Sequence, residues 1–289
     1  MIEEFISSWP LFHNAYLSGW LIGLLLSLIG VLVVARDQIF IGAAVSQASA
    51  LGIAVGMVVG SWITFDEHSW WRSNVFYGLV GGMFSVLAAL ITARGSKTAG
   101  HESHEAVTGW IFLLSLSLSV LLLSHSPHGL EEVHSILTST IIGARATDVW
   151  IFTSLTIVTV IALLFYRQQA LLVVMDPEMA RAVGLHVDRW NAGLSIWLGI
   201  AVGFSIRVSG VVYAFACLVL PALVAKNLGR EVHTMFFVSP VIALSTGVVA
   251  FVLANHYDYP PGQTATAVLC LLLLLAWSFR WFRLRWAGG

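Results

Sequence analysis

The chain has 289 residues, of which 58% are hydrophobic and only 10% are charged, and its mean hydropathy is +0.88. Ordinary soluble domains carry about 25% charged residues, so a soluble fold of this size could not cover its surface. The composition therefore excludes a soluble enzyme and a disordered chain, and a net charge of −1 excludes a nucleic-acid binder with a basic patch. We expect an all-α, polytopic membrane protein built as a bundle of transmembrane helices.

Nine apolar segments are long enough to span a bilayer, which takes about 20 residues. In chain order they are 15–35, 39–61, 75–93, 106–124, 148–166, 190–206, 209–226, 234–254 and 263–282. The sixth and seventh are separated by a very short connection around Arg207 and Gly210. If one of these two is re-entrant, eight spans remain.

The basic residues predict the orientation. With the N-terminus outside, all but three of the 14 lysines and arginines face the cytoplasm, the exceptions being Arg72, Arg145 and Arg207. The positive-inside rule therefore places the N-terminus outside and the C-terminus in the cytoplasm. The acidic start, with Glu3 and Glu4, argues against a cleaved signal peptide.

Ionisable residues are missing from the predicted membrane interior. No Asp, Glu or His lies deep in a predicted span, which argues against a proton-coupled pump and against an intramembrane metalloprotease. Cys217 and Cys270 lie in apolar runs and are predicted to be buried packing thiols, not a disulfide framework. No phosphate-binding GxxxxGK[ST] loop occurs, so another chain would have to hydrolyse any ATP that drives transport.

The second predicted span carries two stripes of small and polar residues. One stripe consists of Gly52, Gly56 and Gly60, which lie on one helix face and let a neighbouring backbone approach closely. The other stripe and its neutral polar neighbours are Ala43, Ser46, Gln47 and Ser49. Polar side chains at membrane depth need partners. They either pack by hydrogen-bonding to adjacent helices, or they line a translocation path.

A short helix is predicted on the cytoplasmic side within residues 176–185. Asp176 is a good N-cap, and Pro177 fits the first helical position. Glu178 suits the positive end of the helix dipole, and Gly184 suits the residue just past the C-terminus. The pattern is typical of an interfacial connector or of a docking element for a cytoplasmic partner.

Two other segments are distinctive. Residues 210–222 form an apolar run in which Pro221 predicts a kink. The predicted outer loop at 255–262 contains His256 and Asp258, which are candidate cation ligands, although such loops are more often simple polar turns.

Together these segments resemble the membrane permease of metal-type ABC importers, the zinc, manganese and iron family, over nearly the whole chain. Residues 33–42 are similar to the first cytoplasmic turn of that family, and 176–184 to its coupling-helix signature. Residues 210–222 are similar to its apolar span ending in Pro-Ala, and 257–262 to its outer loop with Pro and Gly. The order and spacing of the four pieces make the similarity specific.

The resemblance implies a single permease domain over residues 1–289, in the bacterial cytoplasmic (inner) membrane. It implies import of divalent metal ions, with zinc or manganese as the first candidates, along a path to which the second span contributes. The implied coupling helix contains Asp176, Pro177, Glu178, Ala180, Arg181 and Gly184. The implied partners are ATPase subunits that bind ATP and Mg²⁺, an extracytoplasmic metal-binding protein, and a second permease subunit, identical or different. The chain itself is expected to be a transport subunit and not an enzyme, and no cofactor is expected on it.

The second span departs from the family pattern at two positions. The family usually reads Gly-Asp-Ala-x-Ser-His-Ala there, and the resemblance makes its Asp and His the metal ligands. Here Ala43 and Gln47 occupy those two positions, while Gly42, Ser46 and Ala48 are kept. The resemblance therefore implies a path helix but not the ligands that would coordinate the metal.

Three other functions are alternatives to a metal-ion importer. A stand-alone secondary carrier would need coupling-ion sites in the membrane, and an intramembrane enzyme would need a catalytic pair at membrane depth; the predicted spans contain neither. An ABC permease for a chelated metal or another small ligand fits the same pattern without metal ligands.

Overall fold

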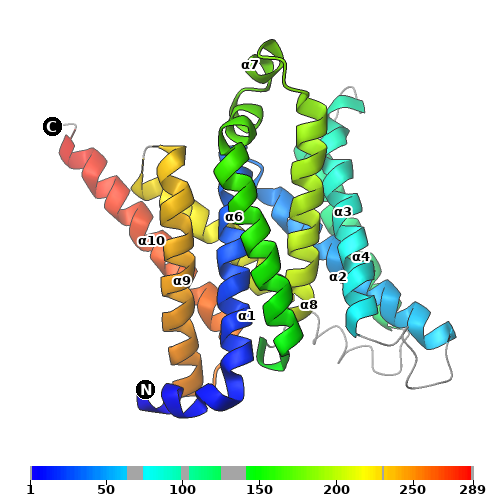
Figure 1. Ribbon diagram of the computed structural model, residues 1–289, viewed down its shortest axis with the longest axis vertical. Helices are drawn as coiled ribbons and strands as arrows, with labels where there is room; N and C mark the ends of the chain where they lie inside the picture. The colour runs from blue at the N-terminus through cyan, green and yellow to red at the C-terminus, as the bar shows by residue number, and fades with distance from the viewer. Residues whose placement is uncertain (1, 64–73, 99–103, 125–140, 230, 288–289) are drawn as a thin grey trace. The chain divides into compact units, whose positions relative to one another are not determined.

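The computed structural model describes residues 2–63, 74–98, 104–124, 141–229 and 231–287, and every regular element in these ranges is helical (Figure 1). The helices are α1 (Ile2–Ala35), α2 (Ile39–Ile63), α3 (Asn74–Thr98), α4 (His104–Ser124), η2 (Ile141–Gly143), α6 (Ala146–Met175), α7 (Pro177–Ala182), α8 (Val187–Leu228), α9 (Val232–Tyr257) and α10 (Pro261–Ala287). Within the described ranges, eight helices are long and apolar enough to cross a membrane, which confirms the predicted polytopic helical fold. The orientation in the membrane stays a prediction.

The first helix is longer than predicted. It begins at Ile2, whereas the hydropathy placed its start near residue 15, because two glutamates and Pro10 interrupt the apolar pattern. The first turns are nevertheless held by aromatic contacts, since the Phe5 and Trp9 rings lie 4.7 and 5.9 Å from the ring of Tyr16. The helix bends in these turns (Figure 1), as expected for a proline that removes a backbone donor.

The predicted spans 190–206 and 209–226 both lie in α8, which is broken at Gly210. This residue has φ 77° and ψ 169°, a conformation that essentially only glycine adopts. The break divides α8 into the segments 187–209 and 211–228. The described residues therefore contain eight spans if α8 is counted as one, and nine if its two segments are counted separately. The sharpest change in the backbone of α8 is therefore at Gly210, and not at Pro221.

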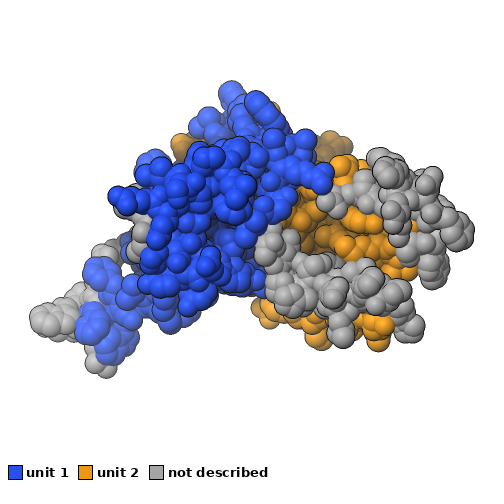
Figure 2. Space-filling view, turned by 90° about the horizontal axis from the view of Figure 1, so that it is seen from below, with its two compact units in different colours: residues 1–35, 140–165, 212–289 blue, residues 36–139, 166–211 orange. Residues whose placement is uncertain are grey.

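The helices form two compact units, coloured blue and orange in Figure 2. Unit 1 comprises residues 1–35, 140–165 and 212–289, and unit 2 comprises residues 36–139 and 166–211. Two helices, α6 and α8, therefore contribute one segment to each unit, and the boundary in α8 comes just after Gly210.

In unit 1, α1 packs along α9, and α9 along α10. Gly19 of α1 lies directly against the Phe251 ring of α9, where a larger residue would not fit. Side-chain hydroxyls also join the helices, because Tyr213 donates to the Gly19 carbonyl at 2.9 Å and Ser239 to the Ser27 carbonyl at 3.2 Å. The two contacts to α1 come from different helices, α8 and α9, so α1 is central to this unit.

The two cysteines are both free but differ in environment. Cys217 in α8 is buried, as predicted, whereas Cys270 in α10 is exposed. The prediction of a buried thiol is wrong for Cys270, because most of the apolar span of α10 has no protein packed over it. An apolar side chain on such a helix faces lipid in a membrane protein.

In unit 2, α2 packs against both α3 and α4. A Cβ atom at Gly52 of α2 would lie 2.7 Å from the Val80 carbonyl oxygen of α3, so the two backbones are in direct contact. The first segment of α8 joins the same group, because the Ser85 hydroxyl of α3 donates to the Gly199 carbonyl at 2.8 Å. Small residues thus position α2, the helix with the predicted path residues.

Candidate functional site

The short helix α7 forms as its local sequence predicts. The Asp176 carboxylate accepts a hydrogen bond from the Met179 N–H at 2.9 Å, which caps the N-terminus, and Pro177 takes the first helical position. At the other end Gly184 has φ 87°, and the Leu185 N–H donates to the Ala180 carbonyl at 2.9 Å. Both ends of α7 are thus fixed by residues within the segment.

One face of α7 is anchored to the helices on either side of it in the sequence. Ala180 is fully buried and packs with Val173 at the end of α6 and Val187 at the start of α8. Leu185 and Trp190 are packed against this cluster, which we call the α7 anchor. Any force on α7 is therefore carried directly into the ends of α6 and α8.

The opposite face of α7 is exposed and mixes apolar with charged side chains. Met179 is 52% exposed and Val183 62% exposed. Asp176, Pro177, Glu178, Arg181 and Gly184 are exposed as well. The helix projects from the end of the helices that it joins (Figure 1), so this face is available to a partner chain.

The stripe on α2 is buried and neutral. Ala43 and Gln47 are 9% and 8% exposed, and Ser46 and Ser49 are fully buried. In the part of the chain that the structure describes, Ser46 Oγ, Gln47 Oε1 and Ser49 Oγ have no hydrogen-bond partner. Buried polar atoms are normally paired, and leaving one unpaired costs about 1–3 kcal/mol. These three oxygens therefore have capacity for a ligand, water or another chain.

No metal site is assembled by the described residues, since they contain no group of three or more His, Cys, Asp or Glu side chains that could hold an ion. The three oxygens of the α2 stripe carry no formal charge. A divalent cation at membrane depth requires anionic or imidazole ligands to offset its desolvation. The described part of this chain thus offers a polar surface but not a complete coordination sphere.

The three glycines of α2 differ in their surroundings. A Cβ atom at Gly52 would meet backbone of α3, whereas at Gly56 it would lie 3.3 Å from the Tyr77 ring. Gly60 is buried near the end of the helix. The α3 backbone therefore lies closer to Gly52 than to Gly56.

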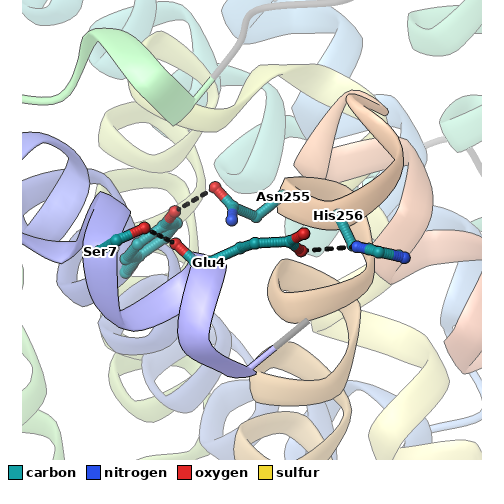
Figure 3. A network of polar contacts seen from close by, with 5 residues as sticks. Glu4, Ser7, Asn255 and His256 are labelled. Carbon is teal, nitrogen blue, oxygen red and sulfur yellow. Dashed lines mark hydrogen bonds and ion pairs between the residues drawn. The ribbon is translucent and has the colours of Figure 1, made fainter.

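The structure places the two outer-loop candidates in different roles. The His256 imidazole lies 2.6 Å from the Glu4 carboxylate, joining the end of α9 to the start of α1 (Figure 3). Nearby, the Tyr16 hydroxyl donates to Asn255 Oδ1 at 3.1 Å. Asp258 has φ 54° and ends α9 as its C-cap. His256 and Asp258 thus both have structural roles, and they belong to no group of three or more possible metal ligands among the described residues.

Sequence reasoning missed one polar contact within unit 2. The Arg36 guanidinium donates to the side-chain oxygen of Asn191, a residue 155 positions away. Burial lowers the pKa of the Arg36 side chain. The one signal in the sequence was a basic residue between two spans, which by itself indicates only the cytoplasmic side.

The manganese import system permease protein ScaB of Streptococcus gordonii is 24% identical over 279 residues, which cover 96% of this chain and 95% of that protein. The manganese transport system membrane protein MntC of Halalkalibacterium halodurans is 22% identical over 274 residues, covering 94% of this chain and 88% of that protein.

The fold is similar to that of a solved protein structure. A chain of PsaBC from Streptococcus pneumoniae, solved in complex with Fab, superposes with a TM-score of 0.78 at 20% sequence identity and covers 96% of this chain and 95% of its own length. The ABC 3 transport family matches residues 8–280, nearly the entire sequence. This chain therefore belongs to the ABC 3 transport family.

Proposed function

We propose that this chain is the membrane-spanning permease subunit of an ATP-driven importer of divalent metal ions in the cytoplasmic membrane of a bacterium. The family match over residues 8–280 is the observation that carries the proposal. Relatives named as manganese permeases support manganese as the first cargo to test, followed by zinc. The N-terminus lies outside in this arrangement, which puts α7 on the cytoplasmic side.

The exposed face of α7 is the docking site for ATPase subunits. Its apolar residues, Met179 and Val183, supply the contact area, and Glu178 and Arg181 orient the partner. The buried Ala180 on the opposite face transmits the resulting force into α6 and α8. ATP and Mg²⁺ belong to the partner, because the sequence contains no phosphate-binding loop of its own.

The α2 stripe lines the translocation path, and its neutrality indicates what the second permease subunit must supply. Two copies of this chain would present only Ser46, Gln47 and Ser49 oxygens from the stripe, all of them uncharged. Neutral oxygens compensate a dication poorly, and zinc prefers imidazole or thiolate. We therefore favour a pair of different permease subunits, in which the second one brings carboxylate and imidazole groups to the path.

A second candidate cargo is a chelated metal. The same neutral stripe suits a complex whose own ligands already surround the ion, because the path then meets neutral or polar ligand atoms and not a bare charge. Hydroxyl and amide oxygens such as those of Ser46 and Gln47 can hydrogen-bond to such a complex.

The test is reconstitution of this chain in proteoliposomes with its ATPase subunits, its extracytoplasmic binding protein and the second permease subunit. We expect uptake of Mn²⁺ or Zn²⁺ that requires ATP and is lost when the ATPase lacks its phosphate-binding lysine. Uptake that continues without the ATPase would instead identify a stand-alone carrier. Presenting Mn²⁺ either free or as its citrate complex separates the two cargo classes.

A further inference from the structure

Arg36 lies in the tight connection between α1 and α2, three residues before α2 begins at Ile39. The connection is compact, because Asp37 has a positive φ of 54° and the Ile41 N–H donates to the Gln38 carbonyl at 3.1 Å. This turn belongs to unit 2, together with all of α2. A change in the position of Arg36 is therefore passed to the first turn of α2.

The partner of Arg36 is well defined. Its Nη2 donates to Asn191 Oδ1 near the start of α8, also in unit 2. In the described ranges no other hydrogen-bond or ion-pair partner of this half-buried guanidinium is found. Burying a cation costs free energy unless the cation is paired. The Asn191 side-chain oxygen therefore contributes much of the free energy that keeps the Arg36 guanidinium in this position.

Asn191 is placed next to the α7 anchor. The preceding residue, Trp190, packs against that cluster, and its ring makes an edge contact with Tyr166 of α6 at 5.9 Å between centroids. The start of α8 therefore makes two contacts. Val187 and Trp190 contact the α7 anchor, and Asn191 accepts the hydrogen bond from Arg36.

These contacts form a continuous route within unit 2. It runs from α7 to the start of α8, across the hydrogen bond to Arg36, and into α2, on which Ser46 and Gln47 lie. We propose that Arg36 is a positioning residue that couples movement of α7 to movement of the path helix α2 through its hydrogen bond to Asn191. This inference rests on the proposed function, since it gives that function one of its mechanical links.

A simpler role for an arginine at the end of a spanning helix is to anchor it among lipid headgroups. Such an anchor extends its charged group into the interface or water. Arg36 instead turns its guanidinium back onto Asn191 and is half-buried. An interfacial anchor also has no need of a specific acceptor on another helix, which makes Asn191 the residue to change.

The experiment compares variants of the full transporter in proteoliposomes and measures Mn²⁺ taken up per ATP hydrolysed. Asn191→Leu removes the acceptor, and we expect about a 3- to 30-fold fall in this ratio, the range found for positions that carry coupling between sites. Asn191→Asp keeps an acceptor for the guanidinium and should retain the ratio of the wild type. The matched control is Asn227→Leu, because Asn227 accepts a similar hydrogen bond from Arg280 at 3.0 Å in unit 1, away from this route.

A double variant separates coupling from folding. Asn191→Leu alone leaves a cation without its partner, which threatens assembly, whereas Arg36→Met with Asn191→Leu replaces both partners by apolar side chains of similar size. We expect this double variant to assemble in normal amounts and still to show the reduced ratio, because the directional bond is gone.

The possible results separate a failure of the proposed function from a failure of the role of Arg36. A wild-type complex without ATP-dependent uptake overturns the proposed function and this role of Arg36 with it. A wild type that transports, with a double variant that keeps the wild-type ratio, overturns the role of Arg36 alone. The same conclusion follows if Asn191→Asp loses as much coupling as Asn191→Leu, because the hydrogen bond is then not what matters.

Discussion

In both units glycines bring helix backbones into direct contact, but α1 of unit 1 and α2 of unit 2 differ in the polar contacts that accompany this packing. In unit 1, a Cβ atom at Gly30 of α1 would lie on the Leu218 carbonyl oxygen of α8, so these two backbones touch. Hydroxyl groups add hydrogen bonds to α1, because Tyr213 donates to the Gly19 carbonyl and Ser239 to the Ser27 carbonyl. In unit 2, glycines bring backbones into direct contact, with Gly52 of α2 against the Val80 carbonyl of α3. Lipid gives no hydrophobic drive for helix association, so both units depend on close packing and hydrogen bonds.

The difference shows where polar groups are used for packing and where they remain available. Unit 1 also has buried atoms without a hydrogen-bond partner among the described residues, Ser18 Oγ and Trp20 Nε1, but they lie beside helices that are joined by other polar contacts. In unit 2 the contact between α2 and α3 is made by glycine, and within the described ranges the Ser46 hydroxyl and the Gln47 side-chain oxygen on α2 have no hydrogen-bond partner. Packing by glycine thus lets a helix be held tightly without using its polar side chains.

The largest expected effect concerns metal binding by the α2 stripe. The purified chain without partners should show no stoichiometric, tight binding of Zn²⁺ or Mn²⁺ in a calorimetric titration, because the stripe is neutral. Ala43→Asp combined with Gln47→His should create binding, since carboxylate and imidazole are suitable ligands for both ions.

One result would contradict the prediction that the α2 stripe does not bind metal by itself. If the unmodified chain binds zinc tightly and Gln47→Ala abolishes that binding, the neutral stripe is itself a metal site. A different second subunit would then not be required. Gain of binding in the double variant alone would show that the path geometry persists without its ligands.

The next largest effect concerns α7. Gly184 has φ 87°, which costs a non-glycine residue about 1–2 kcal/mol and more if it is β-branched, so Gly184→Val should displace the end of the helix. We expect several-fold less metal uptake per ATP hydrolysed, with normal amounts of protein in the membrane. Gly184→Asn is the control, because asparagine tolerates this conformation; equal transport in both variants would exclude a role for the α7 geometry in coupling.

A smaller effect is expected from the glycine contact itself. Gly52→Ala would place a Cβ 2.7 Å from the Val80 carbonyl oxygen and force α2 and α3 apart, at a cost of about 1–3 kcal/mol. The variant should unfold at a lower temperature in detergent. Gly193→Ala in α8 is the matched control, because its Cβ would meet nothing within 4 Å; a similar loss in both variants would mean that the contact of Gly52 with Val80 is not responsible.

The sequence predicted those parts of the structure that depend on neighbouring residues. The helix α7 follows from Asp176, Pro177 and Gly184, which lie within nine positions of one another and act on the backbone beside them. The spans follow in the same way from their continuous apolar composition. The length of α1 was missed because its first turns are stabilised by aromatic packing, which hydropathy does not measure.

Contacts between distant residues could not be predicted from one sequence. The Arg36–Asn191 hydrogen bond and the Glu4–His256 ion pair each join residues that are far apart in the sequence. Nothing in the sequence around any of these residues identifies its partner. The break in α8 is at Gly210, although glycine is tolerated in membrane helices and Pro221 looked the stronger signal. A glycine breaks a helix only where the surrounding packing demands it, and that demand is a property of the fold.

The smallest expected effect tests the hydrogen-bonded packing of unit 1. Tyr213→Phe removes the hydroxyl that donates to the Gly19 carbonyl at 2.9 Å and keeps the ring beside Phe251. Hydrogen bonds between membrane helices average about 0.6 kcal/mol, so the midpoint of thermal unfolding in detergent should fall only slightly. Tyr257→Phe is the control, because Tyr257 is 56% exposed and should tolerate the loss of its hydroxyl. A fall for Tyr213→Phe as large as that for Gly52→Ala would contradict the comparison, because unit 1 would then depend on one hydrogen bond as strongly as unit 2 depends on a direct backbone contact.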